Sequence, residues 1–239
     1  MPVSLATLPL DPVTSIEDAI ARMQGIAAAL PPTDGLACFN RMYLTVTGAL
    51  HTQVDGGFFA DAGFMARLDV NFANRYLAAI STYRSVPREA PRSWRVLLDQ
   101  RADAGLAPLQ FALAGMNAHI NYDLAPALAQ TCTDRTTSPD QGPHHLDFEK
   151  VNQTLQELDP QIRESFEQGV LLELDRRFAG LDNIVDAFSI SAAREAAWAY
   201  GAVLWRLRDE AWLATSLLTT LDRSVGFAGR TLLTHLPKL

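Results

Sequence analysis

Apolar residues recur at intervals of three and four along most of this chain, which is the period of an amphipathic α-helix. One such stripe consists of Leu36, Phe39, Tyr43, Leu44, Thr47 and Leu50. No segment alternates apolar and polar residues in the way that a half-buried strand does. The pattern therefore predicts an all-α fold.

Residues that favour helix ends divide this pattern into about eight or nine helices. Ser15, Asp34 and Asp61 each precede an apolar stripe and are suited to cap a helix N-terminus. Since no repeat or linker separates the helices, we predict a single-domain multi-helix bundle over residues 15–239. Residues 1–14 are expected to form an extended N-terminal arm.

Prolines and polar runs predict the breaks between helices. Pro108 is expected to begin a central helix, and Pro126 is expected to cut it. Pro160 is expected to begin a further helix that ends near Gly180. Residues 131–143 combine Thr, Ser, Asp, Gln, Gly and Pro, and predict a mobile loop.

Several of the predicted helices carry a polar residue on an otherwise apolar stripe. These residues are Asn40, Asp69, His119, Asp123 and Arg194. A charged group in an apolar interior is costly unless another group compensates it, so we expect these side chains to find each other. The sequence thus predicts a central polar cavity between the helices, roofed by residues 131–143.

The central helix has the densest group of such residues. His119 and Asp123 are four positions apart, and so are Asn117 and Asn121, so each pair lies on one helix face. A buried pair of purely structural role remains an alternative for His119 and Asp123.

One chemistry that fits these residues is metal binding. Nitrogen and oxygen donors from facing helices suit Zn, Fe or Mn, and a divalent metal is a candidate cofactor. The candidate ligands are His119, Asp123, Asp69, His145 and Asp147. Neither Glu-x-x-His nor His-Glu-x-x-His is present, so the spacing matches no established metal motif.

The other chemistry is metal-free acid–base catalysis. His119 would act as the acid or base, oriented by Asp123 or Asp69. The candidate substrate-binding residues are Asn40, Tyr43, Asn117, Asn121 and Arg194. For Asn40 and Tyr43 a structural role that links two helices remains the alternative.

Composition narrows the function class. The chain has 239 residues, a net charge of -7 and scattered basic residues, which argues against a nucleic-acid surface. No apolar run reaches the length of a membrane span, and no secretory signal or paired cysteine motif is evident, so we expect a cytoplasmic protein. Phosphate-loop, dinucleotide-binding and nucleophile-elbow patterns are lacking. The expected partner is a small molecule, and a homodimer through the C-terminal helix is a further hypothesis.

Four segments in order resemble a bacterial family known as domain of unknown function 5995. They are FNRMYLTVT at residues 39–47, LDVNFANRY at 68–76, MNAHINYDL at 116–124 and DFEKVN at 147–152. The resemblance extends from about Ser15 to Trp205 and implies no particular activity. The positions that match its motifs are Asn40, Asp69, Asn74, Arg75, His119, Asp123, Asp147 and Asn152.

Three hypotheses for function follow. The first is a small-molecule enzyme with a buried His/Asp site, using hydrolase, lyase or cyclase chemistry with or without a metal. The second is a non-catalytic binding protein for a mainly apolar ligand. The third is a polar core that only fixes the register of the helices.

Overall fold

The first three long helices begin at the caps that the sequence predicts. The Ser15 hydroxyl accepts a hydrogen bond from the Asp18 N–H at 3.1 Å. In the same way Asp34 accepts from the Leu36 N–H at 3.0 Å, and Asp61 accepts from the Phe64 N–H at 2.8 Å. Both donors lie in the first turn of the helix that follows. Each cap satisfies an N–H group that has no partner inside the helix.

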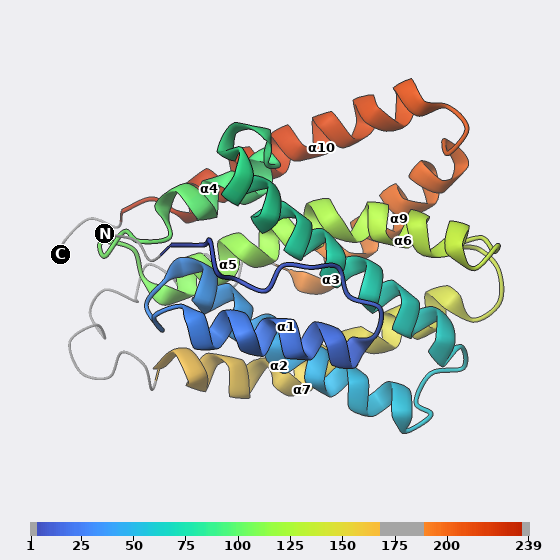
Figure 1. Ribbon diagram of the computed structural model, residues 1–239. Coiled ribbons are helices and arrows are strands. Elements are labelled where there is room, and N and C mark those ends of the chain that lie inside the picture. The colour runs from blue at the N-terminus through green and yellow to red at the C-terminus, as the bar shows by residue number, and fades with distance from the viewer. Residues whose placement is uncertain (1–3, 168–188, 236–239) are drawn as a thin grey trace.

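The computed structural model describes residues 4–167 and 189–235, and these residues form helices and no strand. The fold is therefore all-α, a single compact domain, as the sequence predicts (Figure 1). In chain order the elements are α1 (Ile16–Ala29), α2 (Gly35–Asp55), α3 (Ala62–Ser85), η1 (Pro87–Glu89), α4 (Arg92–Gln100), α5 (Pro108–Ala118), η2 (His119–Asp123), α6 (Leu124–Asp134), α7 (His144–Glu167), α9 (Ile190–Arg206) and α10 (Ala211–Leu232). None of these helices is both long enough and apolar enough to cross a membrane.

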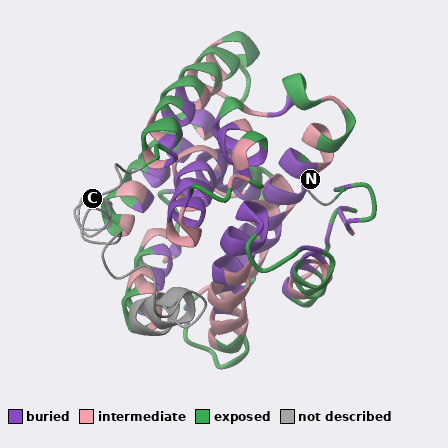
Figure 2. Ribbon diagram, turned by 90° about the vertical axis from the view of Figure 1, so that its left-hand side faces the viewer, coloured by how far each residue is buried: buried purple, intermediate pink, exposed green. Residues whose placement is uncertain are grey.

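The helices surround α5, η2 and α6, which run end to end through the middle of the molecule. Figure 1 shows α1, α2 and α7 on one side of this central run and α4 and α10 on the other. The buried residues gather between the helices, and the outward faces are exposed (Figure 2). The central run thus has packed neighbours on several sides, which is where a buried site can form.

The core consists of two apolar clusters. The first contains residues of the N-terminal arm and of the five helices from α1 through α5. The second contains residues from the end of α2, the start of α3, and α6, α7 and α9. Ala118 belongs to the first cluster and Ile120 to the second, so His119 lies at their junction. Phe72 and Met116 pack against both clusters.

Three expected boundaries are wrong. Pro126 does not end the central helix, because α6 continues through it to Asp134. Pro160 begins no new helix, since α7 runs unbroken from His144 to Glu167, and the expected helix end near Gly180 lies outside the described residues. The loop after α6 is shorter than residues 131–143, because residues 131–134 are helical.

Two helices are capped by side chains distant in sequence. Asp147 of α7 accepts from the N–H groups of Ala60 and Asp61, at 3.0 and 2.7 Å, just before α3. Asp222 of α10 accepts from the N–H groups of Arg92 and Ser93, both at 2.9 Å, at the start of α4. These contacts fix where α3 and α4 begin relative to the rest of the fold.

Candidate functional site

The site is built on η2, a widened helical turn. The Leu124 N–H donates to the carbonyl of His119, five residues back, as in a π-helix. The ring of Pro126 has no N–H and would crowd the carbonyl of Tyr122 four residues earlier in a regular α-helix. The wide turn ends three residues before Pro126, and such turns are frequent at functional sites.

His119 is held by a carboxylate. Its Nδ1 lies 3.0 Å from Oδ2 of Asp123, and the indole N–H of Trp94 donates to the same oxygen at 2.8 Å. All three side chains are buried. Because the carboxylate accepts both bonds, Nδ1 of His119 carries the proton and Nε2 presents a lone pair.

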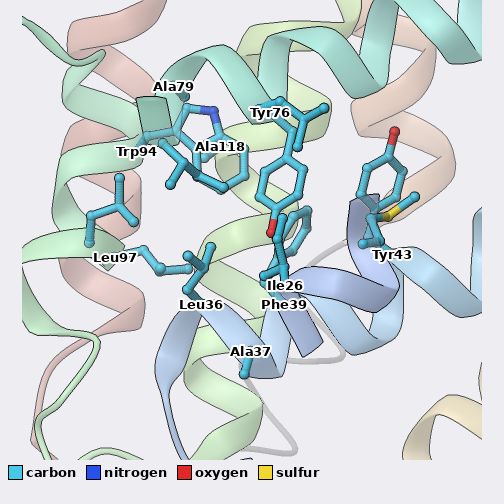
Figure 3. Packing of buried hydrophobic residues seen from close by; sticks show 14 of the residues in the cluster. Ile26, Leu36, Ala37, Phe39, Tyr43, Tyr76, Ala79, Trp94, Leu97 and Ala118 are labelled. Carbon is cyan, nitrogen blue, oxygen red and sulfur yellow. The ribbon is translucent and has the colours of Figure 1, made fainter. Parts of the chain in front are cut away.

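Aromatic rings fix the plane of the imidazole. Phe72 stacks on His119 with ring centroids 3.4 Å apart, and Tyr43 meets it edge-on at 4.5 Å. The rings of Phe39, Tyr43, Tyr76 and Trp94 pack together around α2 and α3 (Figure 3). Burial among these rings lowers the pKa of His119, although the hydrogen bond to Asp123 opposes this shift. The imidazole is therefore neutral at pH 7.

His119 faces a cavity of about 120 Å³. Its polar lining residues are Tyr43, Asp69, His119 and Arg194. The other lining residues are Phe39, Met42, Val46, Leu50, Met65, Leu68, Phe72, Met116, Ile120, Leu124, Val151, Leu155 and Ile190. The sequence predicts a polar cavity at this place, whereas the walls of the cavity are mainly apolar.

Two polar atoms of the lining residues are buried with no hydrogen-bond partner among the residues that the structure describes. They are Nε2 of His119 and Oδ2 of Asp69, whereas the Tyr43 hydroxyl has the Thr47 side chain as a neighbouring partner. An unsatisfied buried polar group costs about 1–3 kcal/mol, so native proteins contain few of them. Because both residues line one cavity, a molecule bound there is a candidate partner for these atoms.

Asp69 differs in protonation from an ordinary carboxylate. Burial raises its pKa to about 7, and among the described residues no ion pair joins it to Arg75 or Arg194. A substantial fraction of Asp69 therefore carries a proton at neutral pH. Burial, and next the charge of Asp69, raise the pKa of Tyr43 well above its usual value.

Arg194 enters the cavity wall from the first turns of α9. Its Nε donates to the side-chain oxygen of Asn152 and another nitrogen donates to the carbonyl of Phe148, both at 2.8 Å. The guanidinium also lies 4.0 Å from the centre of the Phe148 ring. Burial lowers the pKa of Arg194 to about 9, which leaves it a cation at pH 7.

Three predicted substrate-binding residues lie elsewhere. Asn40 donates to the carbonyl of Met23 at 2.8 Å and accepts from the Tyr76 hydroxyl at 3.1 Å, so it links α1, α2 and α3. Asn117 donates to the carbonyl of Val225 on α10 at 3.0 Å, and Asn121 donates to Asn117 at 3.1 Å. None of the three lines the cavity of His119.

The five candidate metal ligands are not brought together. Asp147 caps α3 and pairs with Lys150, and His145 pairs with Glu195 at 3.1 Å on the surface. Within the described ranges, the group whose ligand atoms lie within 4.8 Å of one another is His145, Glu149 and Glu195, two of which are exposed. His119, Asp123 and Asp69 do not form such a group.

Trp94 and Phe72 are site residues that the sequence did not reveal as such. An apolar stripe gives the buried face of a helix and not the partner of each side chain on it. The one signal for Trp94 was its N–H group, which in a buried indole needs an acceptor.

The chain belongs to the family described as Family of unknown function (DUF5995), whose model matches residues 16–235. The resemblance of the four motifs is thereby confirmed over nearly the whole chain. Comparisons with curated proteins and with solved structures find no match.

Proposed function

We propose that this protein is an enzyme that transfers protons on a small molecule enclosed by the cavity. The observation that carries the proposal is that His119 and Asp69 line one cavity and that Nε2 of His119 and Oδ2 of Asp69 have no hydrogen-bond partner among the described residues. Nε2 of His119 has a lone pair that can accept a proton. Oδ2 of Asp69 belongs to a carboxyl group that can donate one.

The protonation states suit the two roles. A general base and a general acid work best when their pKa values lie near the working pH. Burial lowers the pKa of His119, so the base is unprotonated at neutral pH. Burial raises the pKa of Asp69 to about 7, so the acid is partly protonated. Asp123 and Trp94 then act as positioning residues that keep Nε2 directed away from the carboxylate.

The same geometry favours the metal-free form of the chemistry. Nδ1 of His119 and Oδ2 of Asp123 already bond to each other, and Trp94 occupies the same oxygen. A mainly apolar cavity favours lyase or cyclase reactions, which need proton transfer within one substrate, over hydrolysis, which needs a bound water. A cytoplasmic location remains part of the proposal, supported by two free, buried cysteines.

A second candidate function is non-catalytic binding of an apolar ligand. It is favoured by the cavity wall, in which aliphatic, methionine and phenylalanine side chains outnumber the polar ones. Both functions require a ligand in the cavity, so they differ in what His119 contributes.

Hydrogen exchange tests the catalytic function without a known substrate. A panel of small ketones and carboxylic acids would be incubated with the protein in heavy water, and loss of carbon-bound proton signals followed by NMR. We expect exchange in at least one compound and a loss of at least about 100-fold in its rate for His119→Asn. Asparagine retains a donor near the position of Nδ1 and lacks Nε2.

His51→Asn is the matched control, since His51 is a half-buried histidine that faces Glu17 and Asp55 at the surface of α2. This variant should exchange at the wild-type rate. If the folded His119→Asn variant exchanges as fast as the wild type, or if no compound exchanges, the catalytic proposal is wrong and the binding function is preferred.

A further inference from the structure

Arg194 is a buried cation with neutral neighbours. The side chain is 6% exposed, and its two hydrogen bonds go to an amide oxygen and a backbone carbonyl. Among the described residues no carboxylate forms an ion pair with it. Neutral acceptors satisfy N–H groups but leave the charge uncompensated, which is costly in a protein interior.

Asp69 does not neutralise this charge, although both residues line the same cavity. The pKa of Asp69 is raised by burial alone, and that of Arg194 is lowered by burial alone. Two opposite charges in close contact would shift each other in the reverse directions. The cavity therefore has a positively charged subsite at Arg194. A separate subsite for proton transfer lies at His119 and Asp69.

We propose that the substrate is a small carboxylic acid, whose carboxylate pairs with Arg194 and whose apolar body extends toward His119 and Asp69. This inference rests on the proposed function, in which the cavity is the reaction site. The guanidinium offers a planar set of donors that matches the two oxygens of a carboxylate.

Charge and size define this class of ligand. Arg194 is the one Arg or Lys among the described residues that line the cavity, so a monoanion is neutralised and a phosphate dianion is not. A dry cavity of roughly 150 Å³ holds a molecule such as benzene. The cavity of about 120 Å³ next to Arg194 is of the same order, which limits the ligand to one small ring or a short alkyl group that carries one carboxylate.

Benzoate and benzamide form a matched pair of probes, with nearly the same shape and different charge. Isothermal titration calorimetry would compare their binding to the wild type, to Arg194→Gln and to Arg206→Gln. We expect the wild type to bind benzoate at least about tenfold more tightly than benzamide, and Arg194→Gln to lose this preference. Arg206 lies on the same helix, exposed and paired with Asp140, so Arg206→Gln should keep it.

Circular dichroism would confirm that each variant is folded. Arg194→Lys is a second variant, which keeps the charge and should keep a weaker preference for benzoate. Equal binding of the two probes by the wild type overturns the proposal without any variant. A preference that survives in folded Arg194→Gln, or no binding of benzoate at millimolar concentration, also overturns it.

The two proposals fail in different ways. His119→Asn should keep the preference for benzoate over benzamide, because His119 does not contact the carboxylate. If the charge preference is present while exchange does not depend on His119, the acid–base function is wrong and the anion site stands. If exchange depends on His119 while the charge preference is lacking, the acid site is wrong and the catalytic function stands.

Discussion

Asp69 shows at the scale of one residue how a site reduces stability. Its carboxyl group is buried in an apolar wall, and burial raises its pKa from 3.8 to about 7. The folded state therefore holds this proton more tightly than the unfolded state does. As pH rises through the interval between these two values, ionisation favours the unfolded state, and above it the full cost is present.

We expect Asp69→Asn to remove this pH-dependent cost. Relative to the wild type, the variant should gain free energy of unfolding between about pH 4 and about pH 7.5, by at most about 4 kcal/mol. Urea unfolding at the two pH values measures the difference. Parallel pH curves for the two proteins would contradict the assigned protonation.

Asp147 is the matched control, because its linkage has the opposite sign. Burial opposes its ionisation, but hydrogen bonds from the Asp61 N–H, Lys150 and the Ala60 N–H hold its pKa below the usual value. Its stabilisation is present above the unfolded-state pKa and is lost as pH falls through the folded-state value. Asp147→Asn should thus lose stability relative to the wild type as pH rises.

At this scale the sequence predicts burial well and partners poorly. Helical period places Asn40, Asp69, His119, Asp123 and Arg194 inside, and all five are buried. It also predicts the His119–Asp123 bond, because residues four apart on a helix are neighbours. Contacts between helices depend on how the helices cross, which a stripe does not encode. For this reason the sequence left open whether Asn40 binds substrate or links helices, and the structure shows the link.

At the scale of elements, α2 and α5 approach closely beside η2. A Cβ atom on Gly115 would lie 2.4 Å from the ring of Phe39, far inside van der Waals contact. Phe39 in turn meets the ring of His119 edge-on, with centroids 5.6 Å apart. The absence of a side chain at Gly115 therefore helps to set the position of the imidazole.

We expect Gly115→Ala to destabilise the fold by about 1–3 kcal/mol, because the ring of Phe39 must move in a packed core. Thermal or urea unfolding gives the stability, and the chemical shifts of the His119 ring report the displacement. Gly48→Ala is the control, since its Cβ would meet nothing within 4 Å on α2. That variant should gain about 0.5–1 kcal/mol. Equal effects of the two changes would contradict the close approach.

The beginnings of helices were more predictable than their interiors. Ser15, Asp34 and Asp61 act locally, so each cap can be recognised from a few neighbouring residues. Pro126 and Pro160 lie inside helices, because a proline removes one hydrogen bond and a packed helix tolerates that loss. The wide turn η2 also lies inside the central run of helices, and no sequence pattern predicts it.

At the scale of the whole molecule, α10 stabilises α4. The N-cap residue of α4 is Pro91, which provides no side-chain hydrogen bond. Asp222 of α10 accepts from the Arg92 and Ser93 N–H groups and from the Ser93 hydroxyl, each at 2.9 Å. One carboxylate thus joins two helices and satisfies the open end of one of them.

We expect Asp222→Ala to cost about 1–3 kcal/mol, since it leaves the N–H and hydroxyl donors of the buried Ser93 without an acceptor. Hydrogen exchange should show the largest loss of protection in α4 and α10. Asp209→Ala is the control, because Asp209 is an exposed residue whose ion pair with Arg208 spans 3.8 Å. A similar loss of stability in both variants would contradict the capping of α4 by Asp222.

The cap from α10 also bears on the order in which the site is completed during synthesis. Trp94, which holds Asp123 and through it His119, lies directly after the capped residues of α4. Asp222 follows all of these residues in the chain, so the ribosome releases it after them. A nascent or truncated chain that stops before Asp222 has every residue of the His119–Asp123–Trp94 group, but lacks the support that orders the start of α4.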